Sequence, residues 1–167
     1  MTRSPYQTAT TYLLAAVAFL LDQWSKLAVA TAIALGHSSP LVDGVLYLTH
    51  TRNLGAAWSL FWGHTGPLAA VAVAFAIGIV LYERRQAAHP LMITGLGLLL
   101  GGALGNGADR LALGYVRDMI DVHWAGANVF PIFNVADMAV FTGVCCLLAH
   151  QALTERRARV PAAARGE

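Results

Sequence analysis

Four long apolar runs divide the chain, and polar residues gather between them. The runs cover about residues 11–34, 66–82, 90–108 and 134–153. Each approaches the roughly 20 apolar residues that a helix needs to cross a bilayer. The pattern therefore predicts a mostly α-helical membrane protein with four transmembrane helices.

Two of the polar interruptions are long enough to fold on a membrane surface. Residues 36–66 contain "VLYLTHT", which is rich in β-branched and aromatic residues, between the turn-like stretches "VDG" and "RNLG". We expect short strands here that pair with one another or cover the helices, because an unpaired strand edge cannot face lipid. Residues 111–133 contain several glycines and a proline, and we expect an irregular outer loop that joins helices three and four.

Composition agrees with an integral membrane protein, and residues 1–167 are expected to form a single domain. Hydrophobic residues make up 57% of the chain and charged residues 12%, with a mean hydropathy of +0.57. An ordinary soluble domain is less apolar. The first run carries Asp22 and Lys26 and has no small-residue cleavage site after a short apolar core, so it is expected to be a retained helix.

Arginines and aspartates occupy different segments. The N-terminal tail, the link between runs two and three, and the C-terminal tail 154–167 together contain Arg3, Arg84, Arg85, Arg156, Arg157, Arg159 and Arg165. The positive-inside rule places these segments, and both termini, in the cytoplasm, where the basic tail is expected to contact anionic lipid. The aspartates lie elsewhere, toward the outer face, at Asp22, Asp43, Asp109, Asp118, Asp121 and Asp137. This separation indicates that several of them serve one site near the outer face.

Polar residues three or four apart recur inside the predicted helices. Asp22 and Lys26 share a face of the first helix, and Asn106 and Asp109 share a face of the third, with Arg110 beside them. A charge at membrane depth costs about 2.5 to 3.5 kcal/mol. A structural ion pair between Asp22 and Lys26 and a role at a functional site are both open on this pattern.

The start of the fourth helix repeats the spacing with Asn134 and Asp137. Asn134 can cap the helix, and Asp137 lies near the positive end of its dipole. If the preceding loop folds back over the helices, Asp118 meets Asp137, and two close carboxylates cannot easily both ionise. Such a pair can activate a water for attack on a peptide carbonyl and protonate the leaving amine. Other aspartate pairs are equally open on spacing alone.

Signals for other chemistry are weak. The chain has no HExxH, and a metal site built from His123, Asp118 and Asp121 is a minor alternative. We expect no metal, no cofactor and no nucleic-acid partner. Cys145 and Cys146 are adjacent and are expected only to pack, and "GGALGNG" favours close helix packing. The tryptophans at positions 58, 62 and 124 are expected at the headgroup level.

Four blocks resemble one family in their order and spacing. They are "LDQWSK" (21–26), "RNLGAAWS" (52–59), "GGALGNGADRLALGYVRDMIDV" (101–122) and "FNVADMAVFTG" (133–143), and they resemble the signature blocks of bacterial lipoprotein signal peptidase, signal peptidase II. The resemblance covers nearly the whole chain. It implies an aspartic endopeptidase of the bacterial inner membrane that removes the signal peptide of a prolipoprotein by cutting before a diacylglyceryl-modified cysteine. It also implies inhibition by the cyclic peptide globomycin.

The resemblance implies roles for particular residues, with Asp118 and Asp137 as the catalytic pair. Substrate-binding or supporting positions are Asp22, Lys26, Asn53, Gly55, Asn106, Asp109, Arg110, Asn134 and Ala136. The family commonly has an apolar residue before the first catalytic aspartate and Phe after it, whereas this chain has Arg117 and Met119. We expect Arg117 to face headgroups or solvent, and Asp121 has no assigned role.

Two other classes of function compete with the peptidase. A small proton-coupled transporter would use Asp22, Asp109 and Asp137 as a relay, but such proteins are built from repeated halves or broken helices, which the sequence does not show. A non-enzymatic assembly factor would need no paired aspartates. We therefore expect a monomeric peptidase whose partners are the lipidated precursor and membrane lipids.

Overall fold

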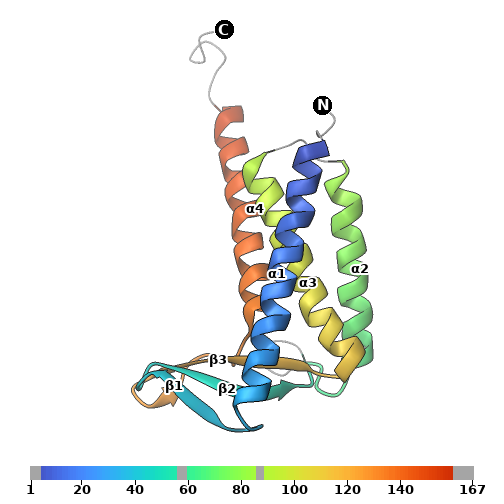
Figure 1. Cartoon of the computed structure of the whole chain (residues 1–167). Helices are drawn as coiled ribbons and strands as arrows, with labels where there is room; N and C mark the ends of the chain where they lie inside the picture. The colour runs from blue at the N-terminus through green and yellow to red at the C-terminus, as the bar shows by residue number, and fades with distance from the viewer. Residues whose placement is uncertain (1–4, 56–59, 86–88, 160–167) are drawn as a thin grey trace.

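A computed structural model describes residues 5–55, 60–85 and 89–159, and in this part of the chain a small sheet lies across one end of a helix bundle (Figure 1). The helices are α1 (Pro5–Ala32), α2 (Thr65–Glu83), α3 (Pro90–Leu113) and α4 (Val135–Arg159). All of them are long and apolar enough to cross a membrane. The predicted helical membrane architecture is therefore confirmed.

Three helices extend beyond their predicted bounds. α1 begins at Pro5, earlier than the predicted start at about residue 11. α3 passes the predicted end at residue 108 because Asp109 is buried within the protein, and the helix ends where Gly114 adopts a positive φ of 77°. α4 continues to Arg159, so the first residues of the predicted tail 154–167 are helical. The expectations for Arg3, Arg165, Trp58 and the rest of the tail fall outside the described residues.

α3 is the central helix and packs against α1, α2 and α4. Its glycines allow this approach. A Cβ on Gly101 would lie 2.5 Å from the Ala15 carbonyl oxygen of α1, and a Cβ on Gly105 would lie 2.5 Å from Oδ2 of Asp22. The close packing predicted for "GGALGNG" is therefore confirmed, and it brings the polar residues of α1 and α3 together.

The sheet is antiparallel with strand order β1-β2-β3-β4. The strands are β1 (Ser38–Val42), β2 (Leu46–Asn53), β3 (Val116–Trp124) and β4 (Ala127–Asn128). The strands expected in residues 36–66 are present. The prediction of an irregular loop over residues 111–133 was wrong for most of that range, because α3 continues to Leu113 and β3 forms by pairing with β2, which is far away in the sequence.

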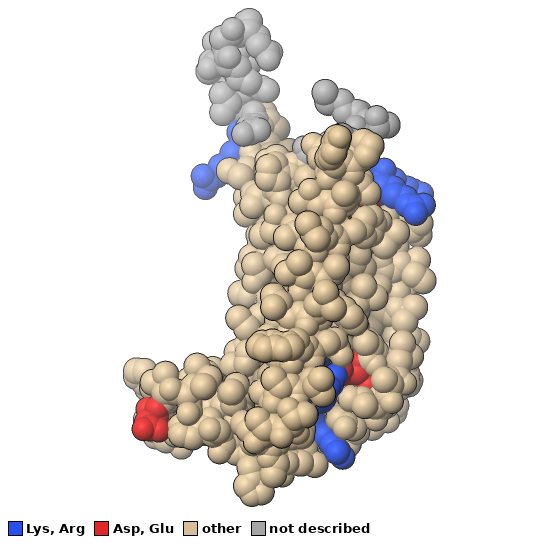
Figure 2. All heavy atoms as spheres, in the orientation of Figure 1, with Lys and Arg blue, Asp and Glu red and all other residues tan. Residues whose placement is uncertain are grey.

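The element order places the described ends of the chain opposite the sheet (Figure 1). α2 ends and α3 begins at that same far end, so Arg84 lies there with the last turns of α4. On the face shown in Figure 2, lysine and arginine gather near the two ends of the molecule, and the helical surface between them shows no charged residue. An apolar middle between polar ends is what a bilayer requires.

Candidate active site

Asp118 and Asp137 come together because the chain folds back after β3. Asp118 lies on β3, and Asp137 lies in the first turn of α4. The returning chain is fastened by Phe133, whose carbonyl oxygen accepts from the Ile120 N–H at 2.8 Å and whose N–H donates to the Ile120 carbonyl at 3.1 Å. The condition set by the sequence, that the loop fold back over the helices, is met.

Asn134 connects the two carboxyl groups. Its Nδ2 donates to Oδ1 of Asp118 at 2.6 Å, and its backbone N–H donates to Oδ2 of Asp137 at 3.1 Å. In return, the Asp137 N–H donates to Oδ1 of Asn134 at 2.9 Å, so the two side chains cap the helix start reciprocally. The cap predicted for Asn134 is present, and it also fixes Asp137 relative to Asp118.

Each carboxylate has a second amide donor. Asn53 at the end of β2 donates from Nδ2 to Oδ2 of Asp118 at 3.0 Å. Asn106 on α3 donates from Nδ2 to Oδ1 of Asp137 at 2.8 Å. Four elements therefore supply donors or acceptors to the pair: β2, β3, α3 and the start of α4.

A buried charge network under the pair sets the orientation of Asn106. The Lys26 Nζ donates to Oδ1 of Asn106 at 2.9 Å and lies 2.7 Å from Oδ2 of Asp22 and 3.4 Å from Oδ2 of Asp109. Because the amide oxygen of Asn106 faces an ammonium, its NH₂ group is left to face Asp137. The Asp22–Lys26 pair is therefore present and contacts the site.

Asp22 also holds the start of α4. Its Oδ1 accepts from the backbone N–H of Ala136 at 2.9 Å. This N–H is one of the groups at a helix start that have no partner within the helix. The contact ties α1 to the turn of α4 that carries Asp137.

Arg117 does not face headgroups or solvent as expected. Its Nη2 lies 2.6 Å from Oδ1 of Asp109 and its Nε 3.2 Å from Oδ2, and its side chain is only 16% exposed. A second bond runs from Nη2 to Oε1 of Gln23 at 2.9 Å. The prediction was wrong because Asp109 is buried and lies within reach, so an ion pair replaces exposure to water. Met119, which follows Asp118, is also buried and only 3% exposed.

Arg110 connects the site to the end of β2. Its Nη2 donates to the Gly55 carbonyl oxygen at 2.9 Å, and the Gly55 N–H donates to Oδ1 of Asn53 at 2.9 Å. The Asn53 amide therefore accepts with its oxygen and donates with its nitrogen to Asp118. Nε of Arg110 is buried and has no partner among the described residues.

The electrostatic environment favours a proton on Asp118. Asp118 is 3% exposed. Burial foremost, and the neighbouring Asp137 charge next, raise the pKa of Asp118 from its ordinary value of 3.8 to about 7, against the opposing bonds from Asn53 and Asn134. Near neutral pH this carboxyl can hold or release a proton.

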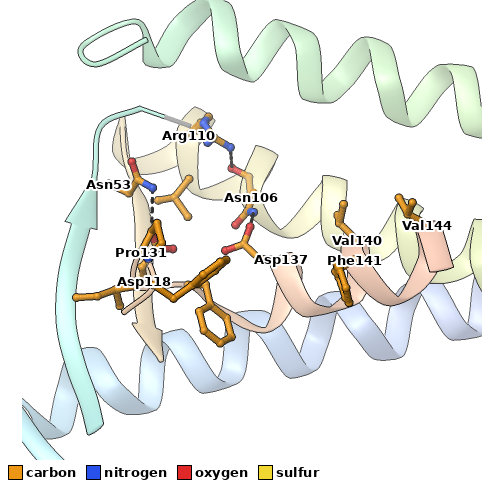
Figure 3. A pocket seen from close by; sticks show the side chains of 13 residues that line it. Asn53, Asn106, Arg110, Asp118, Pro131, Asp137, Val140, Phe141 and Val144 are labelled. Carbon is orange, nitrogen blue, oxygen red and sulfur yellow. Dashed lines mark hydrogen bonds between the residues drawn. The ribbon is translucent and has the colours of Figure 1, made fainter. Parts of the chain in front are cut away.

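A cavity of about 360 Å³ opens beside the pair (Figure 3). Figure 3 shows Asp118 and Asp137 at one end of it, with Val140, Phe141 and Val144 following along α4. The remaining lining is Asn53, Asn106, Arg110, Val116, Phe130, Pro131, Ile132 and Phe133. A polar end that carries the carboxyls thus continues into an apolar channel.

The minor metal alternative does not match the geometry. His123 Nε2 lies 2.9 Å from Oδ1 of Asp121, but Asp118 is on the opposite face of β3, because successive strand residues alternate. Within residues 5–55, 60–85 and 89–159, no three His, Cys, Asp or Glu side chains gather where they could hold a metal ion.

Sequence reasoning missed Gln23 and the apolar lining of the cavity. Gln23 donates from Nε2 to Asp22, to the Gly105 carbonyl and to Asp109 at 3.1 to 3.2 Å. The sequence did contain a signal for Gln23, since a polar amide next to Asp22 inside a predicted transmembrane helix needs hydrogen-bond partners. Phe130, Ile132 and Phe133 carried no such signal, because their role depends on how the returning loop lies.

Comparisons with known proteins agree along the chain. A family model described as signal peptidase (SPase) II matches residues 14–153. The chain is 44% identical over 140 residues to the lipoprotein signal peptidase of Geobacillus thermodenitrificans, which covers 83% of this chain and 87% of that protein. It is 42% identical over 149 residues to the lipoprotein signal peptidase of Halalkalibacterium halodurans, covering 89% and 95%.

Two solved structures share the fold. One is a bacterial membrane enzyme determined by the in meso method at 2.3 Å resolution, with a TM-score of 0.84, 30% identity and 96% of both chains covered. Another bacterial membrane enzyme, determined at 1.9 Å resolution, has a TM-score of 0.77 and 33% identity over 86% of this chain and 92% of that one. The family model's match to residues 14–153 includes β3 and the start of α4.

Proposed function

Because the chain belongs to the signal peptidase (SPase) II family of membrane aspartic peptidases, which remove signal peptides from prolipoproteins, we propose that Asp118 and Asp137 are its catalytic pair. The observation that carries this assignment is the bridge made by Asn134, which holds one oxygen of each carboxyl group. The pair also faces a cavity that continues into an apolar channel.

Asp137 is the base and Asp118 the acid in this proposal. Two observations support the ionised form of Asp137: it accepts hydrogen bonds from the Asn106 amide and the Asn134 N–H, and it lies at the positive end of the α4 dipole. Asp118 has a pKa raised to about 7, so near neutral pH a large share of the molecules carry a proton on it. One ionised and one protonated carboxyl is the arrangement that hydrolysis requires.

The reaction follows from these two states. Asp137 takes a proton from a water whose oxygen attacks the scissile carbonyl carbon, and Asp118 gives its proton to the carbonyl oxygen. The tetrahedral diol then collapses: the C–N bond breaks, the leaving nitrogen receives the proton from Asp137, and a diol hydroxyl returns a proton to Asp118. The pair ends as it began, with one proton.

The substrate in this proposal is a precursor whose cysteine carries a diacylglyceryl group. The apolar channel supports it, since Val140, Phe141 and Val144 extend from the carboxyls along a helix that crosses the membrane. Burial of acyl chains is worth about 0.8 kcal/mol per methylene. Lipid binding can therefore position the peptide bond, while Asn53 and Arg110 orient its polar atoms.

We propose that the sheet end lies on the outer side of the bacterial inner membrane. This orientation is supported by the arginines at the far end, where α2 ends at Arg84 and α4 carries Arg156 in its last turns. The termini are then cytoplasmic. The cyclic peptide globomycin is proposed to occupy the same cavity, and the protein is proposed to act as a monomer.

Cleavage of a synthetic precursor peptide tests this function. The purified protein is expected to cut a diacylglyceryl-modified precursor directly before the modified cysteine, and Asp118→Asn or Asp137→Asn is expected to abolish the cut while the protein stays folded. An amide is nearly isosteric with a carboxyl group but cannot serve as the base or acid. Asp43→Asn, in the exposed turn between β1 and β2, is the matched control and should cut normally.

Two other outcomes would contradict parts of the proposal. Near-normal turnover in either Asn variant would remove that residue from the pair. Equal rates on lipidated and unlipidated precursors would contradict the channel while leaving the aspartic chemistry intact. The transporter alternative is not favoured, because the family and its relatives are peptidases.

A further inference from the structure

Asp121 is a buried carboxylate that the proposed reaction does not use. It is 5% exposed and lies on β3, on the face opposite Asp118. Both of its oxygens are engaged: Oδ2 accepts from the Thr49 hydroxyl at 2.9 Å, and Oδ1 accepts from Nδ2 of Asn128 at 2.7 Å. Its titratable neighbour is His123, whose Nε2 lies 2.9 Å from the same Oδ1. Burying a carboxylate costs free energy unless its oxygens accept hydrogen bonds, so these bonds are what allow Asp121 to be buried here.

The bonds around Asp121 connect every strand of the described sheet. Thr49 belongs to β2 and Asn128 to β4, and Oγ1 of Thr49 also lies 2.7 Å from Oγ of Ser38 in β1. On the same face, the rings of Tyr47 and His123 lie against each other with their centroids 4.7 Å apart and their planes tilted by 46°. Asp121 is the centre of a cross-strand cluster formed by Ser38, Thr49, Asp121 and Asn128.

The pairing of β2 with β3 is irregular next to this cluster. Leu48 pairs with Ile120, and Thr51 pairs with Asp118. Two β2 residues, Thr49 and His50, therefore stand opposite the single β3 residue between these pairs. This is the arrangement of a β-bulge, which shifts the alternation of side chains along one strand.

The bulge is required by the contacts on the two faces of the sheet. In a regular strand Thr49 and Asn53 would point to the same side, because they are an even number of residues apart. Thr49 nevertheless contacts Asp121, and Asn53 contacts Asp118, on opposite faces of β3. Without the bulge, one of these two contacts would be lost.

We propose that Asp121 is a positioning residue for the active site, which holds the β2 bulge through Thr49 and thereby presents Asn53 to Asp118. The proposal rests on the assignment of Asp118 to the catalytic pair. A slip of one residue in strand pairing moves every side chain to the other face, so a bulge at this place decides whether the Asn53 amide reaches the site. Asp121 acts at a distance and touches no reacting atom.

If the bulge is lost, the pKa of Asp118 should change. Asn53 lowers the pKa of Asp118, against burial and Asp137. The charged groups that face Asp118 are Asp137 of α4, Lys26 of α1 and Arg110 of α3. Among the described residues, no hydrogen bond or ion pair joins any of these three groups to Asp121, so a change at Asp121 reaches Asp118 by way of Asn53.

The test is a double-mutant cycle on cleavage of the diacylglyceryl-modified precursor, measured as kcat and KM from about pH 5 to 9. Asp121→Ala and Thr49→Val each remove the hydrogen bond between Thr49 and Asp121 at the bulge. Asn53→Ala removes the hydrogen bond from Asn53 to Asp118 that the bulge is proposed to position. Asp121→Ala and Thr49→Val are each expected to lower kcat about tenfold. Both should also move the alkaline limb of the pH profile of kcat to higher pH, and Asn53→Ala is expected to do the same. KM should change little.

In the Asn53→Ala background, neither substitution should lower kcat further or move the limb again. Asp121→Asn, whose carbonyl oxygen can still accept from Thr49, should be milder than Asp121→Ala. Asp43→Ala is the control and should behave as the wild type. Additive effects with Asn53→Ala, a wild-type pH profile in Asp121→Ala, or loss of folded protein in all Asp121 and Thr49 variants would overturn the positioning role.

Failure of this inference is distinguishable from failure of the proposed function. If the wild type does not cut, or if Asp118→Asn still cuts, the proposed function fails. If the wild type cuts, Asp118→Asn does not, and the cycle shows no coupling between Asp121 and Asn53, only the positioning role fails.

Discussion

The guanidinium of Arg117 holds the buried carboxylate of Asp109 through two nitrogens, with Nη2 2.6 Å from Oδ1 and Nε 3.2 Å from Oδ2. The backbone N–H of Arg117 adds a third bond, to Oδ2 at 2.9 Å. The residue directly before Asp118 is thereby anchored to α3. A side chain that departs from the family pattern has become part of the network beneath the proposed catalytic pair.

Replacing Arg117 with Met should destabilise the protein. Removal of one partner of a buried ion pair costs roughly 3 to 5 kcal/mol, and we expect the lower end because Lys26 remains 3.4 Å from Asp109. Arg117→Lys should recover only part of the loss, since an ammonium cannot form both guanidinium bonds. Thermal unfolding in detergent measures the effect.

Arg52→Met is the matched control for this prediction. Arg52 pairs with Arg117 across the strands but is exposed and stacks on Tyr115 at 4.6 Å. Loss of such a contact costs about 0.5 to 1 kcal/mol. Equal destabilisation by both substitutions would show that the Asp109 pair contributes no more than an exposed contact.

Asp118 should make the folded state less stable as the pH rises. The folded pKa of about 7 lies above the ordinary value of 3.8, so the folded protein binds this proton more tightly than the unfolded chain does. The stability from this group is fully present below about pH 4 and is lost as pH rises through about 7. The difference corresponds to about 4 kcal/mol.

Asp118→Asn removes this titration. The variant should unfold at a higher temperature than the wild type at about pH 8 and show a flatter dependence on pH. Asp43→Asn should keep the wild-type dependence. A wild-type slope in Asp118→Asn would mean that the pKa of Asp118 is not raised by folding.

Gly101→Ala should separate α3 from α1. The new Cβ would lie 2.5 Å from the Ala15 carbonyl oxygen and 2.7 Å from Cβ of Ala18, and backbone cannot yield as a flexible side chain can. Overpacking of this kind costs about 1 to 3 kcal/mol. Gly78→Ala on α2 meets nothing within 4 Å and should unfold at or above the wild-type temperature. Equal stability of the two variants would contradict the close packing.

The orientation in the membrane can be read by thiol labelling. In a background with Cys145→Ala and Cys146→Ala, Ser39→Cys on exposed β1 should react with an impermeant reagent applied outside the cell membrane. Glu155→Cys, exposed near the end of α4, should react only after permeabilisation. The reverse pattern would place the sheet and the proposed site in the cytoplasm.

The sequence by itself determined the four membrane spans and the presence of strands in residues 36–66. A bilayer has a fixed thickness and offers no hydrogen-bond partner to the backbone, so the length and apolarity of a segment decide locally whether it spans. The motif blocks also singled out Asp118 and Asp137, which the structure brings together through Asn134. Their catalytic roles remain a prediction.

Only the tertiary structure decided how the outer segments meet. β3 lacks a regular alternation, since Arg117 and Asp118 are adjacent and Met119 and Ile120 are adjacent. Its partner β2 is far away in the sequence, so no local pattern revealed the strand, its bulge or the place of Asp121. Arg117 turned inward because Asp109, on the preceding helix, is buried and within reach. Strand register and ion-pair choice depend on groups that are distant in sequence, and their energies exist only after the helices have packed.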